Sequence, residues 1–176
     1  MANREALREL QARLASRLQA ARSEGMSVAW LALRVGGKNL LFPLGQSGEI
    51  FPLTSLQPVP YARDWFRGVI NIRGGLYGVV DLAGFIAGDM GGVRTEPAAQ
   101  DLSVVTLNVA LEVNCALQVD GLLGLRGGDA FTSSAAAEPG APAYFGHQFI
   151  DSAGEQWQEI DLRILSQTPQ FLSISA

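Results

Sequence analysis

Apolar residues near the start of the chain recur at helical spacing. They follow one another at steps of three or four, which places them on one stripe of an α-helix. This stripe consists of Leu7, Leu10, Leu14, Leu18 and Ala21. Gly25 follows the last of them, and glycine is common just after a helix. The pattern predicts an amphipathic helix over residues 3–24.

From residue 28 onward the pattern is that of short β-strands separated by turns. The predicted strand pairs are 28–35 with 39–42, 68–72 with 76–80, 102–108 with 110–119, and 145–150 with 156–160. Asp120-Gly121 is either a turn or a bulge before a further strand at 122–125. Short helices are predicted at 82–87 and 162–166, followed by a final apolar piece at 171–174. Many short strands with frequent turns favour a barrel or a sandwich.

Two stretches that are poor in regular apolar patterning divide the chain. Residues 88–100 contain Gly91-Gly92 and Pro97, and we interpret them as a connection between two halves of the fold. Residues 130–144 are rich in Ala, Ser and Pro, and little in their sequence is expected to hold them rigidly. The predicted organisation is a helix over 1–25 and an all-β domain of two subdomains over 26–176.

Composition adds limits on size, compartment and partner. A chain of 176 residues with 48% apolar residues can bury one sizeable core, or two small barrels that share a core. The net charge of −4 argues against nucleic acid as a partner. A single cysteine excludes an intrachain disulfide and fits a reducing compartment. With no secretory signal and no long apolar run, we expect a cytoplasmic protein without membrane insertion.

The residues that could carry catalysis are few. His147 is the only histidine, so a two-histidine metal site cannot be assembled. Cys115 lies inside a predicted strand, where a buried apolar role outweighs a nucleophilic pair with His147. Asp81 and Asp120 each follow an apolar strand, so they are either an acid–base pair or strand ends that bond nearby backbone amides. We favour the second reading, and predict no catalytic residue, cofactor or metal.

The most informative stretch runs from Trp65 to Leu82. One arginine, Arg73, lies here between two strongly apolar strands. It is either a solvated charge at a hairpin or a guanidinium that bonds a neighbouring segment or a partner. The residues alone leave these two readings open.

At these residues the sequence resembles the CheW-like coupling proteins of bacterial chemosensory systems. The family signature Gly-Val-x-Asn-Leu-Arg-Gly, followed by Val-Asp-Leu, is matched here at 68–74 and 80–82, with Ile72 in place of the leucine. Gly48-Glu49-Ile50, Pro58-Val59-Pro60 and Leu117–Gly121 resemble further family segments. The resemblance covers most of the chain, although residues 126–145 match weakly.

The resemblance implies an all-β fold with short helices. It consists of two intertwined five-stranded SH3-like β-barrels with a groove between them, to which this chain adds its N-terminal amphipathic helix. It also implies an adaptor that joins the cytoplasmic tip of a chemoreceptor to the regulatory domain of a CheA-type histidine kinase. Segments 33–38, 42–45 and 81–86 resemble the branch of the family that serves type IV pilus twitching motility.

The resemblance also assigns roles to individual residues. Glu49, Gly68 and Arg73 fall on positions associated with receptor coupling, and Val104 and Val105 lie on a strand that helps line the groove. Four further residues match the motif with an expected structural role, namely Asn71, Gly74, Asp81 and Asp120.

Three alternatives remain at this point. The first is a coupling protein of a flagellar or other chemosensory system. The second is a small-ligand-binding or enzymatic β-barrel that uses Asp81, Asp120 or Cys115. The third is that the helix over 3–24 mediates self-association, because its leucine stripe must be buried somewhere.

Overall fold

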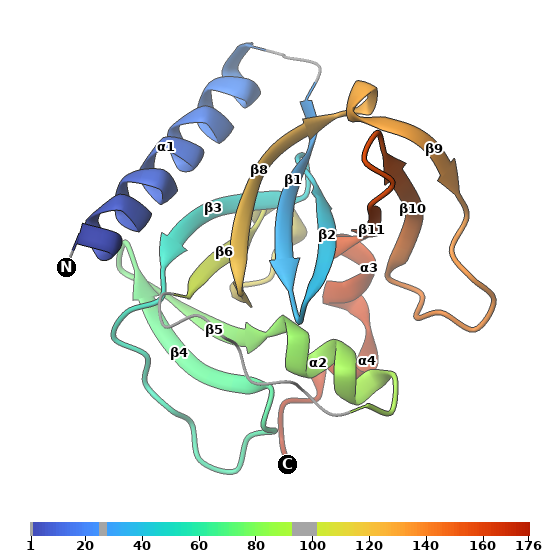
Figure 1. The fold of residues 1–176 in the computed structure, drawn as a ribbon. Helices are drawn as coiled ribbons and strands as arrows, with labels where there is room; N and C mark the ends of the chain where they lie inside the picture. Colours follow the sequence, from blue (N-terminus) through green and yellow to red (C-terminus); the bar gives the residue numbers. More distant parts are fainter. Residues whose placement is uncertain (1, 25–27, 93–101) are drawn as a thin grey trace.

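A computed structural model describes residues 2–24, 28–92 and 102–176 of the chain. Its strands form two mixed sheets (Figure 1). The first sheet has six strands in the order β8-β1-β2-β11-β10-β9, in which only β2 and β11 pair in parallel. Its members are β1 (Val28–Val35), β2 (Lys38–Pro43), β8 (Gly121–Gly127), β9 (Phe131–Ala135), β10 (Phe145–Asp151) and β11 (Gln156–Ile160).

The second sheet has five strands in the order β3-β6-β7-β5-β4, in which β5 and β7 pair in parallel. Its members are β3 (Ser47–Pro52), β4 (Phe66–Ile72), β5 (Gly75–Asp81), β6 (Ser103–Leu107) and β7 (Cys115–Val119). The expected mostly β fold is confirmed. The first sheet, however, has a sixth strand that the five-stranded expectation lacked.

The two sheets interleave along the chain. Strands from both ends of the described chain build the six-stranded sheet, whereas the middle of the chain builds the five-stranded one. Residues 88–100 therefore do not join two halves, because the elements before and after them belong to the five-stranded side. Most of that segment lies outside the described residues. The chain instead crosses between the sheets twice, once between β2 and β3 and once at Asp120, which separates β7 from β8.

One shared hydrophobic core lies between the sheets. It includes Leu31 and Phe42 from the first sheet and Val105 and Leu117 from the second, all fully buried. The opposite face of each sheet has a smaller cluster of its own, around Trp157 in the first sheet and around Val104, Val79 and Ile70 in the second. Successive strand residues point to opposite faces, so a strand with cores on both sides is apolar throughout.

The helices cover the rims of the sheets. The helices are α1 (Ala2–Glu24), α2 (Leu82–Asp89), α3 (Leu162–Gln167) and α4 (Pro169–Leu172), and two 3₁₀ turns are η1 (Val109–Leu111) and η2 (Gly128–Ala130). The predicted helices over 3–24, 82–87 and 162–166 are confirmed. Phe85 of α2 meets Phe171 of α4 edge to face, with ring centroids 5.4 Å apart, which joins α2 to the C-terminal segment.

The helix α1 lies against β3 and β8 (Figure 1). Leu14 is buried there, and the amide of Gln11 donates a hydrogen bond to the hydroxyl of Ser103. Leu7 and Leu10 remain exposed, so the predicted leucine stripe is only partly buried. The side chains of Leu18 and Ala21, and Gly25, lie outside the part that the structure describes.

The hairpins 28–35 with 39–42, 68–72 with 76–80 and 145–150 with 156–160 are confirmed. The predicted strand over 110–119 begins only at Cys115, because the left-handed φ of 56° at Glu112 ends a 3₁₀ turn. The segment over 130–144, which we expected to be loosely held, contains β9, and β9 gains its hydrogen bonds from β10. None of the helices among the described residues combines the length and the hydropathy of a membrane-spanning helix.

Candidate partner-binding site

Arg73 lies at the tip of the hairpin that β4 and β5 form. Ile72 pairs with Gly75, so Arg73 and Gly74 alone make the turn. Their φ angles are 51° and 81°, and two successive positive φ angles match the right-handed twist of a hairpin. The side-chain oxygen of Asn71 accepts a hydrogen bond from the backbone N–H of Gly74 at 3.0 Å. The turn therefore fixes the point from which the Arg73 side chain extends.

The guanidinium of Arg73 joins the two edges of the five-stranded sheet. Its Nη1 lies 2.7 Å from Oε1 of Glu49 on β3. The centre of the guanidinium lies 5.7 Å from the ring centroid of Phe51, two residues farther along β3. Because β3 and β4 are the first and last strands of the sheet, this contact requires the sheet to curl. Such curling is what a small barrel needs.

The strand β6 holds Glu49 in place. The backbone N–H of Glu49 donates to Oγ1 of Thr106 at 2.8 Å. A side chain at the preceding Gly48 would put its Cβ 2.1 Å from that same oxygen, so only glycine allows this approach. The side chains of Arg73 and Glu49 are 71% and 42% exposed, and exposed pairs contribute only about 0–1 kcal/mol to stability. Both charges are therefore accessible to a partner at low cost to the fold.

Partly exposed apolar side chains lie on the same five-stranded side of the fold as this ion pair, and one of them, Phe51, contacts Arg73. Leu76 in the same hairpin is 61% exposed. Five other side chains are packed against the small cluster of the five-stranded sheet but are only partly buried, namely Phe51, Leu53, Leu56, Ile72 and Tyr77. A charged pair within a partly exposed apolar surface has the composition of a protein-binding surface. We call the Arg73–Glu49 pair with these six apolar residues the hairpin site.

Gly68, Val104 and Val105 do not present side-chain surface to a partner. Gly68 is buried with a φ of 138°, and a Cβ there would lie 2.1 Å from the carbonyl oxygen of Gln57. Val104 and Val105 are fully buried in the two cores on either side of β6. Each of them shapes the five-stranded sheet from within, so their expected role in partner binding stays a prediction and cannot depend on exposed side chains.

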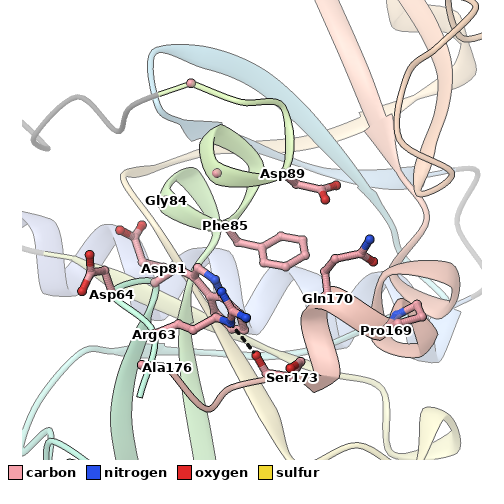
Figure 2. Close-up of a pocket in the computed structure, with 13 residues that line it drawn as sticks. Arg63, Asp64, Asp81, Gly84, Phe85, Asp89, Pro169, Gln170, Ser173 and Ala176 are labelled. Atoms are coloured by element: carbon pink, nitrogen blue, oxygen red, sulfur yellow. Dashed lines mark hydrogen bonds between the residues drawn. The ribbon is translucent and has the colours of Figure 1, made fainter. Parts of the chain in front are cut away.

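A cavity of about 950 Å³ lies between α2 and the C-terminal segment (Figure 2). Arg63 stands in it and donates from Nε to the backbone oxygen of Ser173 at 2.9 Å. Asp81 lines the cavity, but Asp120 does not, because Asp120 accepts a hydrogen bond from the N–H of Gly36 at 2.6 Å. The two aspartates therefore do not meet as an acid–base pair in this cavity. Asp120 bonds a backbone amide, as predicted, although that amide lies 84 residues away in the sequence, and Asp81 makes no side-chain cap to α2.

Cys115 and His147 lie apart. Cys115 is buried on β7, and burial raises the pKa of its thiol to about 12, which keeps it protonated. His147 is exposed on β10 in the other sheet. The apolar role predicted for Cys115 is confirmed. Among the described residues, no group of three or more His, Cys, Asp or Glu side chains could hold a metal ion.

The family of CheW-like domains matches residues 29–168, which is most of the chain and includes every residue of the hairpin site. The chain belongs to the CheW-like family. The helix α1 precedes the matched region.

Two similar proteins extend this comparison. The sequence is 30% identical over 114 residues to Protein PilI of Pseudomonas aeruginosa, a match that covers 65% of this chain and 61% of PilI. The chain therefore matches less than two thirds of the length of that relative. The crystal structure of the scaffolding protein TtCheW from Thermoanaerobacter tengcongensis superposes with a TM-score of 0.65 at 15% identity, over 82% of this chain and 96% of that one. This second likeness shows a shared fold.

Two residues that support the Arg73–Glu49 pair in this CheW-like chain were not found from the sequence. Phe51 lies under the Arg73 guanidinium, and Thr106 binds the backbone of Glu49. Phe51 follows Glu49 by two positions, so both residues share one face of a strand. That signal depends on recognising β3, which the pattern of Ser47–Pro52 did not reveal. For Thr106 no local signal exists, since its contact spans 57 residues.

Proposed function

We propose that this CheW-like protein is a non-enzymatic adaptor in a chemosensory array. It couples the cytoplasmic tip of a chemoreceptor to the regulatory domain of a CheA-type histidine kinase. The observation that carries this proposal is the hairpin site, in which an exposed ion pair lies within partly exposed apolar surface. Membership of the family and the scaffolding relative with the same fold support it.

An adaptor of this kind acts by differential binding. It stabilises the active arrangement of the kinase, and the state of the receptor changes that coupling. A small surface such as the hairpin site gives modest affinity for one receptor, and many linked copies in an array strengthen it. The proposed coupling role requires no catalytic residue, cofactor or metal. It also implies that the protein acts in the cytoplasm, beside membrane-bound receptors.

The experiment that tests the proposal is a binding titration with a receptor cytoplasmic fragment from the same organism. We expect Arg73→Ala to fold and to bind the fragment about tenfold or more weakly, because a charged interface contact is lost. Arg163→Ala is the matched control, since Arg163 is an exposed arginine on α3 outside the hairpin site. Equal affinities of both folded variants and the wild type would contradict the role of the hairpin site.

We further propose that the array controls type IV pilus twitching motility. The support is the 30% identity to PilI and the segments at 33–38, 42–45 and 81–86. A strain that lacks the gene is expected to lose surface twitching and to keep swimming. The reverse result would favour a flagellar system.

Kinase coupling has its own assay. Purified kinase, receptor fragment and adaptor are mixed, and autophosphorylation of the kinase is followed with time. We expect receptor control of the kinase to require the adaptor and to be weakened by Arg73→Ala but not by Arg163→Ala. Receptor control that persists without the adaptor would refute the coupling role.

A further inference from the structure

Among the side chains of α1 that the structure describes, the buried ones lie in the middle of the helix. Gln11 and Leu14 are buried, and Gln11 is hydrogen-bonded to Ser103 on β6. One to two turns earlier, Leu7 and Leu10 are 38% and 49% exposed. Leucines at this exposure leave apolar surface in water that a partner could cover.

A small cavity of about 100 Å³ lies between the start of α1 and the end of β3. Its walls include Arg4, Leu7 and Arg8 of α1, and Pro52, Leu53 and Leu102 of the body. Leu53 also belongs to the hairpin site. Glu49, Phe51 and Leu53 follow one another along one strand and its continuation, so the surface of the hairpin site continues into this cavity.

Charge indicates what kind of partner fits. Arg4 and Arg8 line the cavity from one side, and Arg73 stands in the hairpin site together with Glu49. The chain as a whole has a net charge of −4, so this strip is locally basic on an acidic protein. A basic border around apolar surface favours an apolar segment flanked by acidic side chains.

Shape indicates a helical partner. Leu7 and Leu10 are one turn apart on α1, so they form a ridge of the kind that packs into the groove of another helix. An amphipathic helix laid beside α1 would cover this ridge with its apolar face.

We propose that the first turns of α1 and the Pro52–Leu53 segment extend the hairpin site into one docking groove. Its occupant is an amphipathic α-helix of the partner, with acidic side chains bordering the apolar face. This inference rests on the proposed function, because it adds a second wall to the same partner-binding surface. This second wall is formed by the first turns of α1, which precede the matched family domain at residues 29–168.

The test uses the full-length protein and the same receptor cytoplasmic fragment as probe. The variants are Arg8→Glu and Leu10→Gln on α1, with Arg163→Glu as the control for charge reversal and Arg73→Ala as the reference for the hairpin site. Arg8, Leu10 and Arg163 are all exposed, and circular dichroism shows whether each variant keeps its helices.

We expect Arg8→Glu to weaken binding about tenfold at low salt and less at high salt, because ionic contacts are screened. Leu10→Gln should weaken binding at both salt concentrations, and Arg163→Glu should leave it unchanged. Wild-type affinity of folded Arg8→Glu and Leu10→Gln, with weakened Arg73→Ala, overturns the α1 wall and leaves the proposed function intact.

Two further outcomes also decide against the inference. If the wild-type protein does not bind the receptor fragment, both the proposed function and the contribution of α1 to binding are refuted. Light scattering provides the second outcome. A mass in solution that changes with Leu10→Gln, while fragment binding does not change, assigns the leucines to self-association and overturns the docking groove.

Discussion

Gly68→Ala tests whether this glycine is needed for the fold or for contact with a partner. Gly68 has a φ of 138°, which side chains disfavour, and a Cβ there would lie 2.1 Å from the carbonyl oxygen of Gln57. Gln57 and Val69 exchange two backbone hydrogen bonds of 2.9 and 2.8 Å across this point. An alanine must therefore push the Gln57 segment away and break that bridge.

The expected loss of unfolding free energy combines two contributions. A side chain at a disfavoured backbone conformation costs about 1–3 kcal/mol. The two lost hydrogen bonds cost about 1 kcal/mol each. We therefore expect a loss of about 3–5 kcal/mol, a large share of the stability of a typical domain.

Urea denaturation followed by tryptophan fluorescence measures this loss, and two glycines serve as controls. Gly74 has a φ of 81° with no atom within 4 Å of a Cβ, so Gly74→Ala should cost only the backbone penalty of about 1–2 kcal/mol. Gly128 has neither feature, so Gly128→Ala should change stability by less than about 1 kcal/mol. If Gly68→Ala is no less stable than Gly74→Ala, the close approach to Gln57 does not constrain the fold and the reasoning fails.

Three further predictions concern single groups. Arg73→Ala and Glu49→Ala should each lower the unfolding free energy by less than about 1 kcal/mol in urea titrations, because the pair is exposed. Cys115 should react with a thiol reagent only as fast as the protein unfolds, since burial raises its pKa to about 12; rapid native-state labelling would contradict this. The Trp157 indole N–H bonds Asp151 and lowers the pKa of its carboxyl below the ordinary 3.8. The ionised Asp151 carboxylate therefore stabilises the fold at pH values above 3.8, and this contribution is lost as the pH falls through the lowered pKa. Asp151→Asn should accordingly lower the unfolding free energy near neutral pH and match the wild type in strong acid. Denaturation over a pH series checks this, and an equal deficit at every pH would count against it.

The hairpins and the first helix could be predicted because their signals are local. Val28–Val35 and Phe66–Ile72 alternate or run apolar up to glycine-containing turns, and the leucines of α1 recur every three or four residues. The strands β3 and β9 gave no such signal. Ser47–Pro52 contains Gly48 and ends in proline, and Phe131–Ala135 is mostly small and polar. Each becomes a strand because a distant or later strand supplies its hydrogen bonds.

The assignment of strands to sheets was also beyond the local pattern. A parallel contact such as β2 with β11 joins segments more than 100 residues apart, and no periodicity marks it. For the same reason the connection over 88–100 was misread, since a break in apolar patterning does not reveal which sheet the next strand joins. Parallel pairing depends on the whole topology rather than on neighbouring residues.

The hairpin site, too, could be predicted only in part from the sequence. The resemblance named Arg73 and Glu49, and the structure brings these two side chains together at 2.7 Å. It also named Val104 and Val105, both of which are fully buried. Burial on both faces of β6 explains this difference, because a resemblance transfers positions along a strand and not their exposure. The supporting contact from Phe51 required the curl of the sheet to be known.

The weakness of the Arg73–Glu49 pair is what suits it to the proposed coupling. A deeply buried ion pair would be costly to break, since its removal leaves an uncompensated charge. This pair is exposed and lies where the curled sheet brings β3 beside the β4–β5 hairpin. A partner that offers its own carboxylate to Arg73 therefore competes with Glu49 at small cost, while the two hydrophobic faces of the sheet keep its curvature. Partner exchange at the surface and rigidity beneath it then come from different residues, so a change at Arg73 is expected to alter binding without unfolding the sheet.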